Sequence, residues 1–120
     1  MMIPSLLLKK LYTLGSLKNT AGGVQFAIKN RLSDAEIVGV TGIAINGDPV
    51  ALERVLFDLG DGIELPVSQV DAAHPAPFPL RSAVTIQTGA PHLAKGKHQI
   101  EISVETRPFG KLQFKVEDAI

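Results

Sequence analysis

The sequence contains no cysteine and no tryptophan, and it has one tyrosine among its 120 residues. Without cysteine the chain forms no disulfide, carries no thiolate nucleophile and offers no cysteine ligand to zinc. Carbohydrate-binding modules usually stack sugar rings on exposed tryptophan or tyrosine, whose rigid faces supply much of the contact area. The scarcity of such rings argues against a lectin-like role.

The sequence also lacks any excess of one charge. Twelve lysines and arginines balance twelve aspartates and glutamates, so nucleic acid, which attracts concentrated basic residues, is not an expected partner. The apolar run at residues 3–8 is too short to span a membrane. It precedes Lys9 and Lys10, whereas a secretion signal carries its basic residues first. We therefore expect a cytoplasmic protein with no membrane segment.

The length of the chain sets the scale of the fold. A chain of this size buries about two-thirds of the surface that it exposes when unfolded. We expect residues 1–120 to form a single domain whose core needs neither metal nor disulfide.

The clearest structural pattern lies in residues 97–117. Apolar residues occupy the even positions and polar residues the odd positions, on both sides of a short turn. This period of two predicts two half-buried strands joined as a hairpin. Pairing Ile102 with Phe114 places both apolar sets on one face and sets Glu101 opposite Lys115 on the other, where opposite charges attract.

Similar alternation predicts strands at residues 12–18, 23–30, 36–45 and 84–88. Residues 46–47 are Asn-Gly, the pair most typical of a tight hairpin turn. About eight short strands separated by regular turns predict an all-β fold, an antiparallel β-sandwich.

Four segments are less regular. Residues 1–11 suit a helical turn or a strand edge equally well. Residues 50–56 continue as a strand or form a helical turn. Residues 58–62 resemble a calcium loop in composition, but they lack its spaced acidic ligands, so a plain turn is the better interpretation. The prolines in residues 65–80 exclude a central strand and predict a long loop that crosses between sheets.

The proline-rich part of this loop has two interpretations. It is a structural crossover whose Phe78 fills one end of the core, or a preordered polyproline-like loop that docks on a partner chain. Both interpretations can hold together. Phe109 is a second aromatic residue expected at a turn, beside Arg107. The partner-interface candidates are His74, Pro75, Pro77, Phe78, Pro79, Arg107 and Phe109.

No constellation of residues suggests catalysis. The histidines stand alone at positions 74, 92 and 98, without the spacing that aims two ligands at one metal ion. In the register above, His98 faces Asp118, and we interpret it as a structural histidine held by that carboxylate. We therefore expect no catalytic, metal-binding or cofactor-binding residue in this chain.

Several stretches resemble the β subunit family of the C-glycoside deglycosidases. The resemblance covers roughly residues 12–120 and includes the closing strand from residue 112. It rests on residues 15–19 (Gly-Ser-Leu-Lys-Asn), 26–30, 75–80 (with Pro-Phe-Pro-Leu), 93–102 (Leu-x-x-Gly-x-His-x-Ile-x-Ile) and 106–110 (Thr-Arg-Pro-Phe-Gly).

This resemblance implies a function in a heteromeric complex. The partner would be a TIM-barrel α subunit, similar to sugar phosphate isomerases and epimerases, that holds a divalent metal ion, manganese, and the general base. The complex, a lyase of carbohydrate metabolism, would cleave the C-C glycosidic bond of 3-oxo-C-glycosides, with the present chain as its non-catalytic β subunit. The alternatives are a free-standing β-sandwich that binds carbohydrate or protein, and an independent enzyme.

Overall fold

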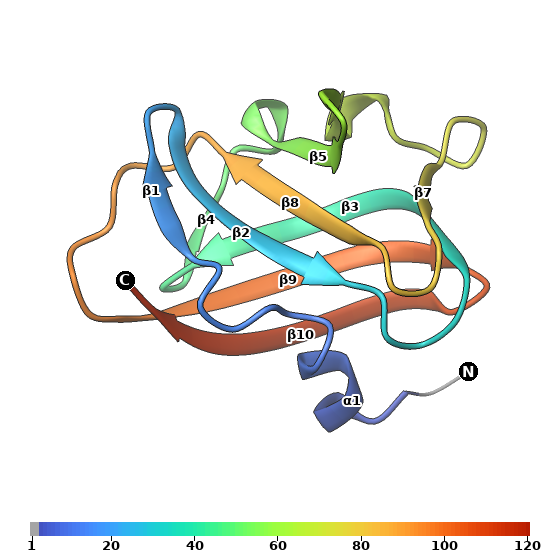
Figure 1. Cartoon of the computed structure of the whole chain (residues 1–120), viewed down its shortest axis with the longest axis horizontal. Helices are drawn as coiled ribbons and strands as arrows, with labels where there is room; N and C mark the ends of the chain where they lie inside the picture. Colours follow the sequence, from blue (N-terminus) through green and yellow to red (C-terminus); the bar gives the residue numbers. More distant parts are fainter. Residues whose placement is uncertain (1–2) are drawn as a thin grey trace.

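A computed structural model describes residues 3–120, and in it two antiparallel sheets pack face to face (Figure 1). This confirms the predicted all-β fold. The helical content is small, and no helix in residues 3–120 is long and apolar enough to cross a membrane.

The first sheet has the strand order β1-β2-β8-β5-β6. Strand β2 lies beside β8, with Phe26 opposite Ile86, and β8 lies beside β5, with Ile86 opposite Phe57. All three of these side chains are buried. The bounds of the strands are β1 Lys18–Thr20, β2 Gly23–Lys29, β5 Leu56–Gly60, β6 Ile63–Pro66 and β8 Ala83–Thr88.

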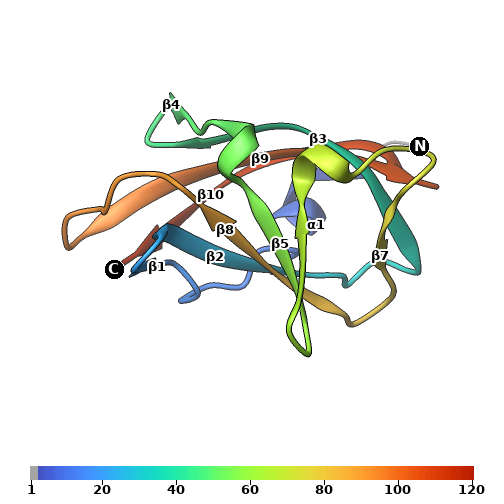
Figure 2. The same cartoon turned by 90° about the horizontal axis from the view of Figure 1, so that it is seen from above.

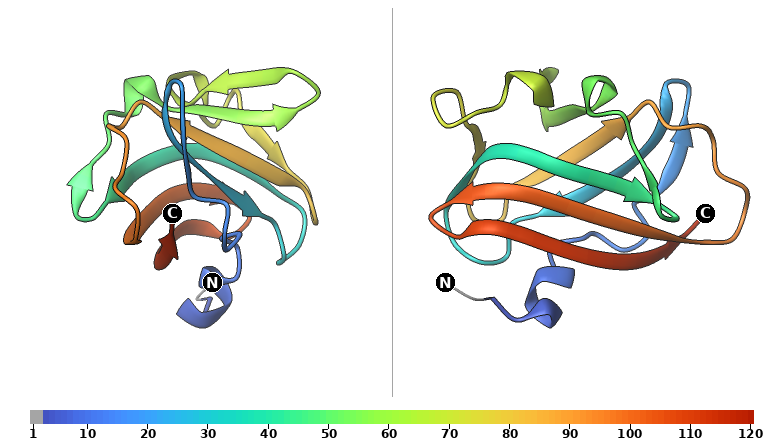
Figure 3. Two further views of the ribbon diagram at one scale, coloured as in Figure 1. Left: turned by 60° about the vertical axis from the view of Figure 1, so that its left-hand side comes forward. Right: turned by 180° about the vertical axis from the view of Figure 1, so that it is seen from behind.

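The second sheet has the order β10-β9-β3-β4, and β7 also pairs with β3. Seen from behind, β3, β9 and β10 run side by side along the length of the molecule (Figure 3). The bounds are β3 Ala35–Ile45, β4 Asp48–Pro49, β7 Ala76–Phe78, β9 Lys97–Arg107 and β10 Gly110–Ala119.

The β9–β10 hairpin has the register expected from its alternation. Ile102 faces Phe114, and Glu101 faces Lys115. The Lys115 Nζ lies 3.3 Å from a carboxylate oxygen of Glu101 on the exposed face of the sheet. Both apolar side chains lie in the core, so the period of two located the buried face of each strand correctly.

The Asn-Gly turn in the middle of the chain also forms as predicted. Asn46 and Gly47 both have positive φ angles, 54° and 84°, and they connect β3 to the short edge strand β4. Pro49 lies in that edge strand, where the missing backbone donor costs no ladder hydrogen bond. Residues 58–62 contain the end of β5 and the two-residue turn to β6 at Asp61 and Gly62. The Asp58 side chain accepts a hydrogen bond from the Gly60 amide at 2.9 Å.

Residues 65–80 cross between the sheets as predicted. The chain leaves β6 of the first sheet, forms the 3-10 turn η2 (Val67–Gln69), and enters the second sheet as β7. It then returns to the first sheet as β8. Viewed from above, β7 stands apart from β8 and runs beside the start of β3 (Figure 2).

The structure differs from the sequence prediction in three details. The structure has ten strands rather than about eight, and one of them, β7, lies within residues 65–80, which were expected to be a loop. Residues 12–17 form no strand, and only Tyr12 makes an isolated bridge, to Ile28. The two ambiguous segments contain a short helix, α1 (Ser5–Lys9), and a 3-10 turn, η1 (Leu52–Arg54).

The burial of one face of β10 predicts that substitutions at neighbouring residues have different effects on the free energy of unfolding. Phe114 is 5% exposed, so Phe114→Ala removes a packed ring and lowers the free energy of unfolding by about 3–5 kcal/mol. The neighbouring Lys115→Ala removes an exposed side chain with one surface ion pair, which costs less than about 1 kcal/mol. Urea denaturation measures both; equal effects of the two changes would contradict the face assignment.

Candidate functional site

The interface candidates from the proline-rich loop and from the β9–β10 turn come together at one end of the sandwich. Glu36 of β3 pairs with Pro77 of β7 on one side and with Arg107 of β9 on the other. The same end is visible in Figure 1, where β7 and the β9–β10 turn lie at the right. We call this surface the end face: residues 74–80, Glu36 and residues 107–109.

The end face is fixed by a buried amide. Asn30 is 1% exposed, and its side-chain nitrogen donates to the backbone oxygens of Phe78, at 2.5 Å, and Ser33, at 2.7 Å. Its side-chain oxygen accepts from the Leu32 amide at 2.9 Å. The strand β7 and the loop after β2 are therefore tied to one residue. Such satisfied buried polar groups hold a loop in one conformation.

The candidates at the end face differ in exposure. Phe78 is 4% exposed, so its ring is a core residue, as the structural interpretation of the loop expected. Pro75 and Phe109 are half-buried, whereas Pro77 and Pro79 are exposed. The exposed part of the end face thus combines these prolines with the polar side chains of His74, Glu36 and Arg107.

One ion pair and one histidine–carboxylate contact lie in or beside the end face. Arg107 lies 3.1 Å from a carboxylate oxygen of Glu36. His74 donates its amide to Asp71 at 2.7 Å, and its Nδ1 lies 3.2 Å from the same oxygen. The amide hydrogen bond from His74 is the main reason that the pKa of Asp71 lies below its ordinary value.

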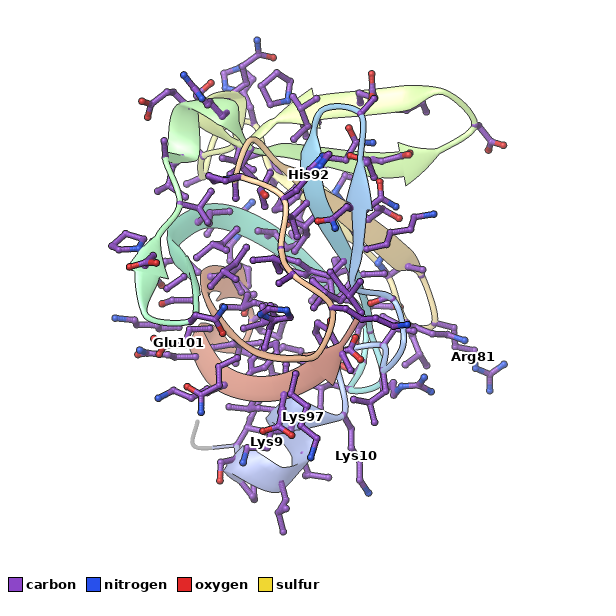
Figure 4. The ribbon with its side chains drawn as sticks, turned by 90° about the vertical axis from the view of Figure 1, so that its left-hand side faces the viewer. Lys9, Lys10, Arg81, His92, Lys97 and Glu101 are labelled. Atoms are coloured by element: carbon purple, nitrogen blue, oxygen red, sulfur yellow. The ribbon has the colours of Figure 1, made fainter. Side chains whose placement is uncertain are left out.

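A hollow of about 300 Å³ occupies the opposite end of the sandwich. We call it the end cleft. Figure 4 looks onto this end, and His92 lies there on the connection from β8 to β9. The cleft is lined by Ile45, Asn46, Asp48, Pro49, Val50, Ala51, Arg54, Gly89, Ala90, Pro91, His92 and Leu93.

One wall of the end cleft depends on a glycine. A Cβ atom added to Gly89 would lie 2.8 Å from Cδ and 2.9 Å from Cβ of Arg54, closer than such atoms approach each other. The side-chain stem of Arg54 therefore rests directly on the backbone of Gly89. The exposed Arg54 residue thus contributes its side-chain stem to the lining of the cleft.

The predicted pairing of His98 with the Asp118 carboxylate is wrong. The two residues are register partners, but His98 instead bonds to the Asn46 side chain at 2.9 Å through Nδ1 and to the Ala94 carbonyl at 2.7 Å through Nε2. Asp118 is turned towards the N-terminal segment. A structural role for His98 fits these contacts, which join the β3–β4 turn to the start of β9.

Asp118 is the one carboxylate among the buried polar residues of the described chain. Its oxygens accept from the Tyr12 hydroxyl at 2.7 Å and from the amides of Gly15, at 3.0 and 3.1 Å, Leu17, at 3.2 Å, and Ala119, at 2.8 Å. These donors lie on the segment between α1 and β1 and on its own strand. Asp118 therefore anchors the N-terminal segment to the end of β10.

These contacts also determine the charge of the pair. Burial acts to raise the pKa of Asp118, but the hydrogen bonds from Tyr12 and from the three amides outweigh it and hold that pKa below its ordinary value. The pKa of Tyr12 is raised, first by burial and then by its bond to Asp118. An ionised carboxylate with this many donors is an anchor rather than a proton acceptor for substrate.

A larger hollow, of about 590 Å³, lies on the outer face of the second sheet. Lys9 of α1, Lys111 and Lys115 of β10 and Glu101 of β9 are among its lining residues. The ion pair of Lys115 with Glu101 lies within it. No group of three or more potential metal ligands occurs in the part of the chain that the structure describes.

The chain matches a known protein family. The family model described as "Hydroxymethylglutaryl-CoA reductase, N-terminal domain" matches residues 7–120. No curated protein matches the chain.

This match overturns the resemblance to the C-glycoside deglycosidase β subunits. The implied lyase function, the TIM-barrel α subunit and the metal site on that subunit are withdrawn with it, and so is the free-standing module proposed as the alternative. The motifs behind the resemblance have a local explanation. Residues 75–80 contain β7, and residues 106–110 form the β9–β10 turn, so their composition reflects what strands and turns of many sandwiches require.

Sequence reasoning missed the anchor and the cleft. Tyr12 and Asp118 are separated by 106 positions, and no pattern links them. For the cleft a weak signal existed, because Gly89, Ala90 and Pro91 form a small, rigid stretch on which a long side chain can lie.

The Asp118 anchor predicts a specific pH dependence. A carboxylate whose pKa is lowered by folding stabilises the protein above its unfolded pKa, and this stabilisation is lost as the pH falls through the folded pKa. Asp118→Asn should therefore destabilise the chain at neutral pH, and its difference from the original chain should shrink below about pH 4. Urea denaturation across pH measures this.

The exposed Glu64→Gln is the matched control, and it should show no such difference. Tyr12 gives an independent measure, because it is the only tyrosine in the sequence. Phenolate absorbance should appear at lower pH in Asp118→Asn than in the original chain. An unchanged Tyr12 titration would contradict the assigned bond.

Proposed function

The chain belongs to the family described as the N-terminal domain of hydroxymethylglutaryl-CoA reductase, and from this premise we propose that it serves such a reductase as an accessory domain. In this role it docks on the part of the reductase that carries the reaction. It supplies a binding surface and no reacting group.

The observation that carries this proposal is the construction of the end face. Its exposed prolines lie on or beside β7, which is held in place by Asn30 and by pairing with β3. The half-buried Phe109 lies in the β9–β10 turn. A surface that is already ordered loses little conformational entropy on binding, which favours a protein interface. Aromatic and apolar residues ringed by charged pairs such as Arg107 and Glu36 match the anatomy of such interfaces.

The state of the titratable groups supports an accessory role. The carboxylate of Asp118 already accepts hydrogen bonds in the anchor, and His98 bonds to two neighbours. His74 is engaged with Asp71 at the surface. These groups already have structural partners. A cytoplasmic location remains part of the proposal and rests on the sequence alone.

Binding to the reductase tests the proposal directly. The chain, carrying an affinity tag, is mixed with the catalytic part of the hydroxymethylglutaryl-CoA reductase of the same organism, and complex formation is measured by calorimetry. We expect a specific complex. Pro77→Glu, which places a charge at the centre of the end face, should weaken it by about tenfold or more, as changes at interface hot spots do.

Leu14→Glu is the matched control, because Leu14 is 74% exposed and lies outside the end face. It should leave the affinity unchanged. Consumption of hydroxymethylglutaryl-CoA by the isolated chain would contradict the accessory role, and equal effects of the two changes would contradict the docking surface.

A further inference from the structure

Four basic residues lie together at the end of β2, on three segments of the chain that run side by side. The Lys29 amide donates to the Leu11 carbonyl at 2.7 Å, and the Arg81 amide donates to the Asn30 carbonyl, also at 2.7 Å. In Figure 4 the side chain of Arg81 points away from the sheets, on the same side of the sandwich as Lys10. We call this group the basic corner: Lys10, Lys29, Arg31 and Arg81.

Two of these residues are held in defined positions. The Nε atom of Arg31 donates to the Lys10 carbonyl at 3.0 Å, which orients the guanidinium group. Arg81 has a φ of 71°, a left-handed conformation that disfavours residues other than glycine and asparagine. Strained backbone of this kind is frequent at functional sites. The strain at Arg81 therefore suggests that the side chain at this position has a function.

The positive charge of the basic corner is not balanced by neighbouring carboxylates. None of its four residues makes an ion pair within residues 3–120. Asp34 accepts a hydrogen bond from the Leu80 amide at 2.9 Å, and it makes no ion pair there either. The basic corner is thus a local excess of positive charge in a chain whose formal net charge is zero. Such a surface attracts a negatively charged partner.

The width of the basic corner indicates the form of that partner. Tyr12 bridges to β2 on one side, and β8 pairs with β2 on the other, so the basic residues occupy three neighbouring segments. Neighbouring strands lie about 4.8 Å apart, which gives the row a width of about 10 Å. A single phosphate group is too small to reach both sides. In an extended peptide, side chains on one face recur about every 7 Å, so alternate carboxylates match the row.

The basic corner adjoins the end face. Leu80, the last residue of segment 74–80, directly precedes Arg81 and is 44% exposed. The two surfaces are therefore continuous, and an apolar side chain lies between the prolines and the cations. Protein interfaces combine apolar and charged residues in this way. The continuity favours a protein segment as the occupant of the basic corner.

We propose that the basic corner binds an extended acidic segment of a protein partner. Alternate carboxylates of this segment bind Lys10, Arg31 and Arg81, and the two guanidinium groups offer each carboxylate a pair of hydrogen bonds. The acidic character of the segment follows from the basic corner alone. That the segment belongs to the catalytic part of the reductase rests on the proposed function.

The test uses the 120-residue chain labelled with ¹⁵N and titrated with a hexaglutamate peptide that is capped at both ends. We expect saturable shifts of the Arg31 and Arg81 amides, with an affinity that falls as the salt concentration rises. A capped hexaglutamine peptide should cause no shifts. Inorganic phosphate or phosphatidylserine vesicles that bind as tightly as hexaglutamate would overturn the assignment to a protein segment.

Substitutions in the basic corner then assign the binding. Arg81→Asn removes one charge with a residue that tolerates positive φ, and Arg31→Gln removes a second. The double variant should weaken hexaglutamate binding by about tenfold or more, whereas lysine at both positions should retain part of the affinity. The matched control combines Lys95→Gln with Lys97→Gln, which removes two exposed cations near the start of β9; it should change nothing. The amide spectrum verifies that each variant is folded.

The outcomes separate this inference from the proposed function. Shifts that do not saturate, that hexaglutamine reproduces, or that persist in the double variant would overturn the basic corner as a site. Docking on the reductase is measured without peptide, so it can succeed while the basic corner fails. Hexaglutamate binding without docking would support the basic corner and refute the accessory role. Where docking occurs, excess hexaglutamate should weaken it, and a failure to compete would overturn the assignment of the acidic segment to the reductase.

Discussion

The pairing of β9 with its two neighbours is the constraint on which the second sheet depends. Strand β9 is bonded to β10 along one edge and to β3 along the other, so it holds the longest strands of the molecule together. Its side chains alternate between core and solvent, and a one-residue slip would turn Lys115 of β10 inward and Phe114 outward. Because that exchange would bury a charge, odd slips of the register are excluded. The β9–β10 turn, which belongs to the end face, is positioned by the same register.

The Asp118 anchor connects the second sheet to the first sheet. Tyr12, held by the carboxylate at the end of β10, packs its ring 6.0 Å from that of Phe26 in β2. One buried carboxylate therefore joins the second sheet, the N-terminal segment and the first sheet. Burying the charge is costly, but the hydroxyl and amide donors offset the cost. Removing one of these donors leaves the buried charge of Asp118 with fewer hydrogen bonds. The anchor is therefore sensitive to changes in Asp118 and in its donors.

The parts of the fold that were predictable are those governed by local chemistry. The register of the β9–β10 hairpin follows from alternation, and the β3–β4 turn follows from Asn46 and Gly47, which tolerate positive φ. The strand predicted to begin at residue 12 does not form over residues 12–17, because alternation indicates which residues are buried and not which conformation they adopt. Tyr12 and Leu17 are buried, but both are bonded to a distant aspartate. The interface candidates were named because prolines and aromatics at turns are visible in a sequence, and their role in binding stays a prediction. The end cleft was not foreseen, since its walls come from two separated segments, residues 45–54 and 89–93, that only the folded chain brings together.

Strand β3 is one of the strands that connect the two ends of the sandwich. Its first residues pair with β7 at the end face, and its last residue, Ile45, lines the end cleft. At about 3.3 Å per residue, the strand spans most of the longest dimension of the molecule, 37 Å. Between its ends β3 stays bonded to β9, with irregular register near Gly39 and Gly42. A change at one end could reach the other by shifting this ladder or that of β9 with β10, and breaking either would expose the core below. The geometry therefore favours two ends that act independently.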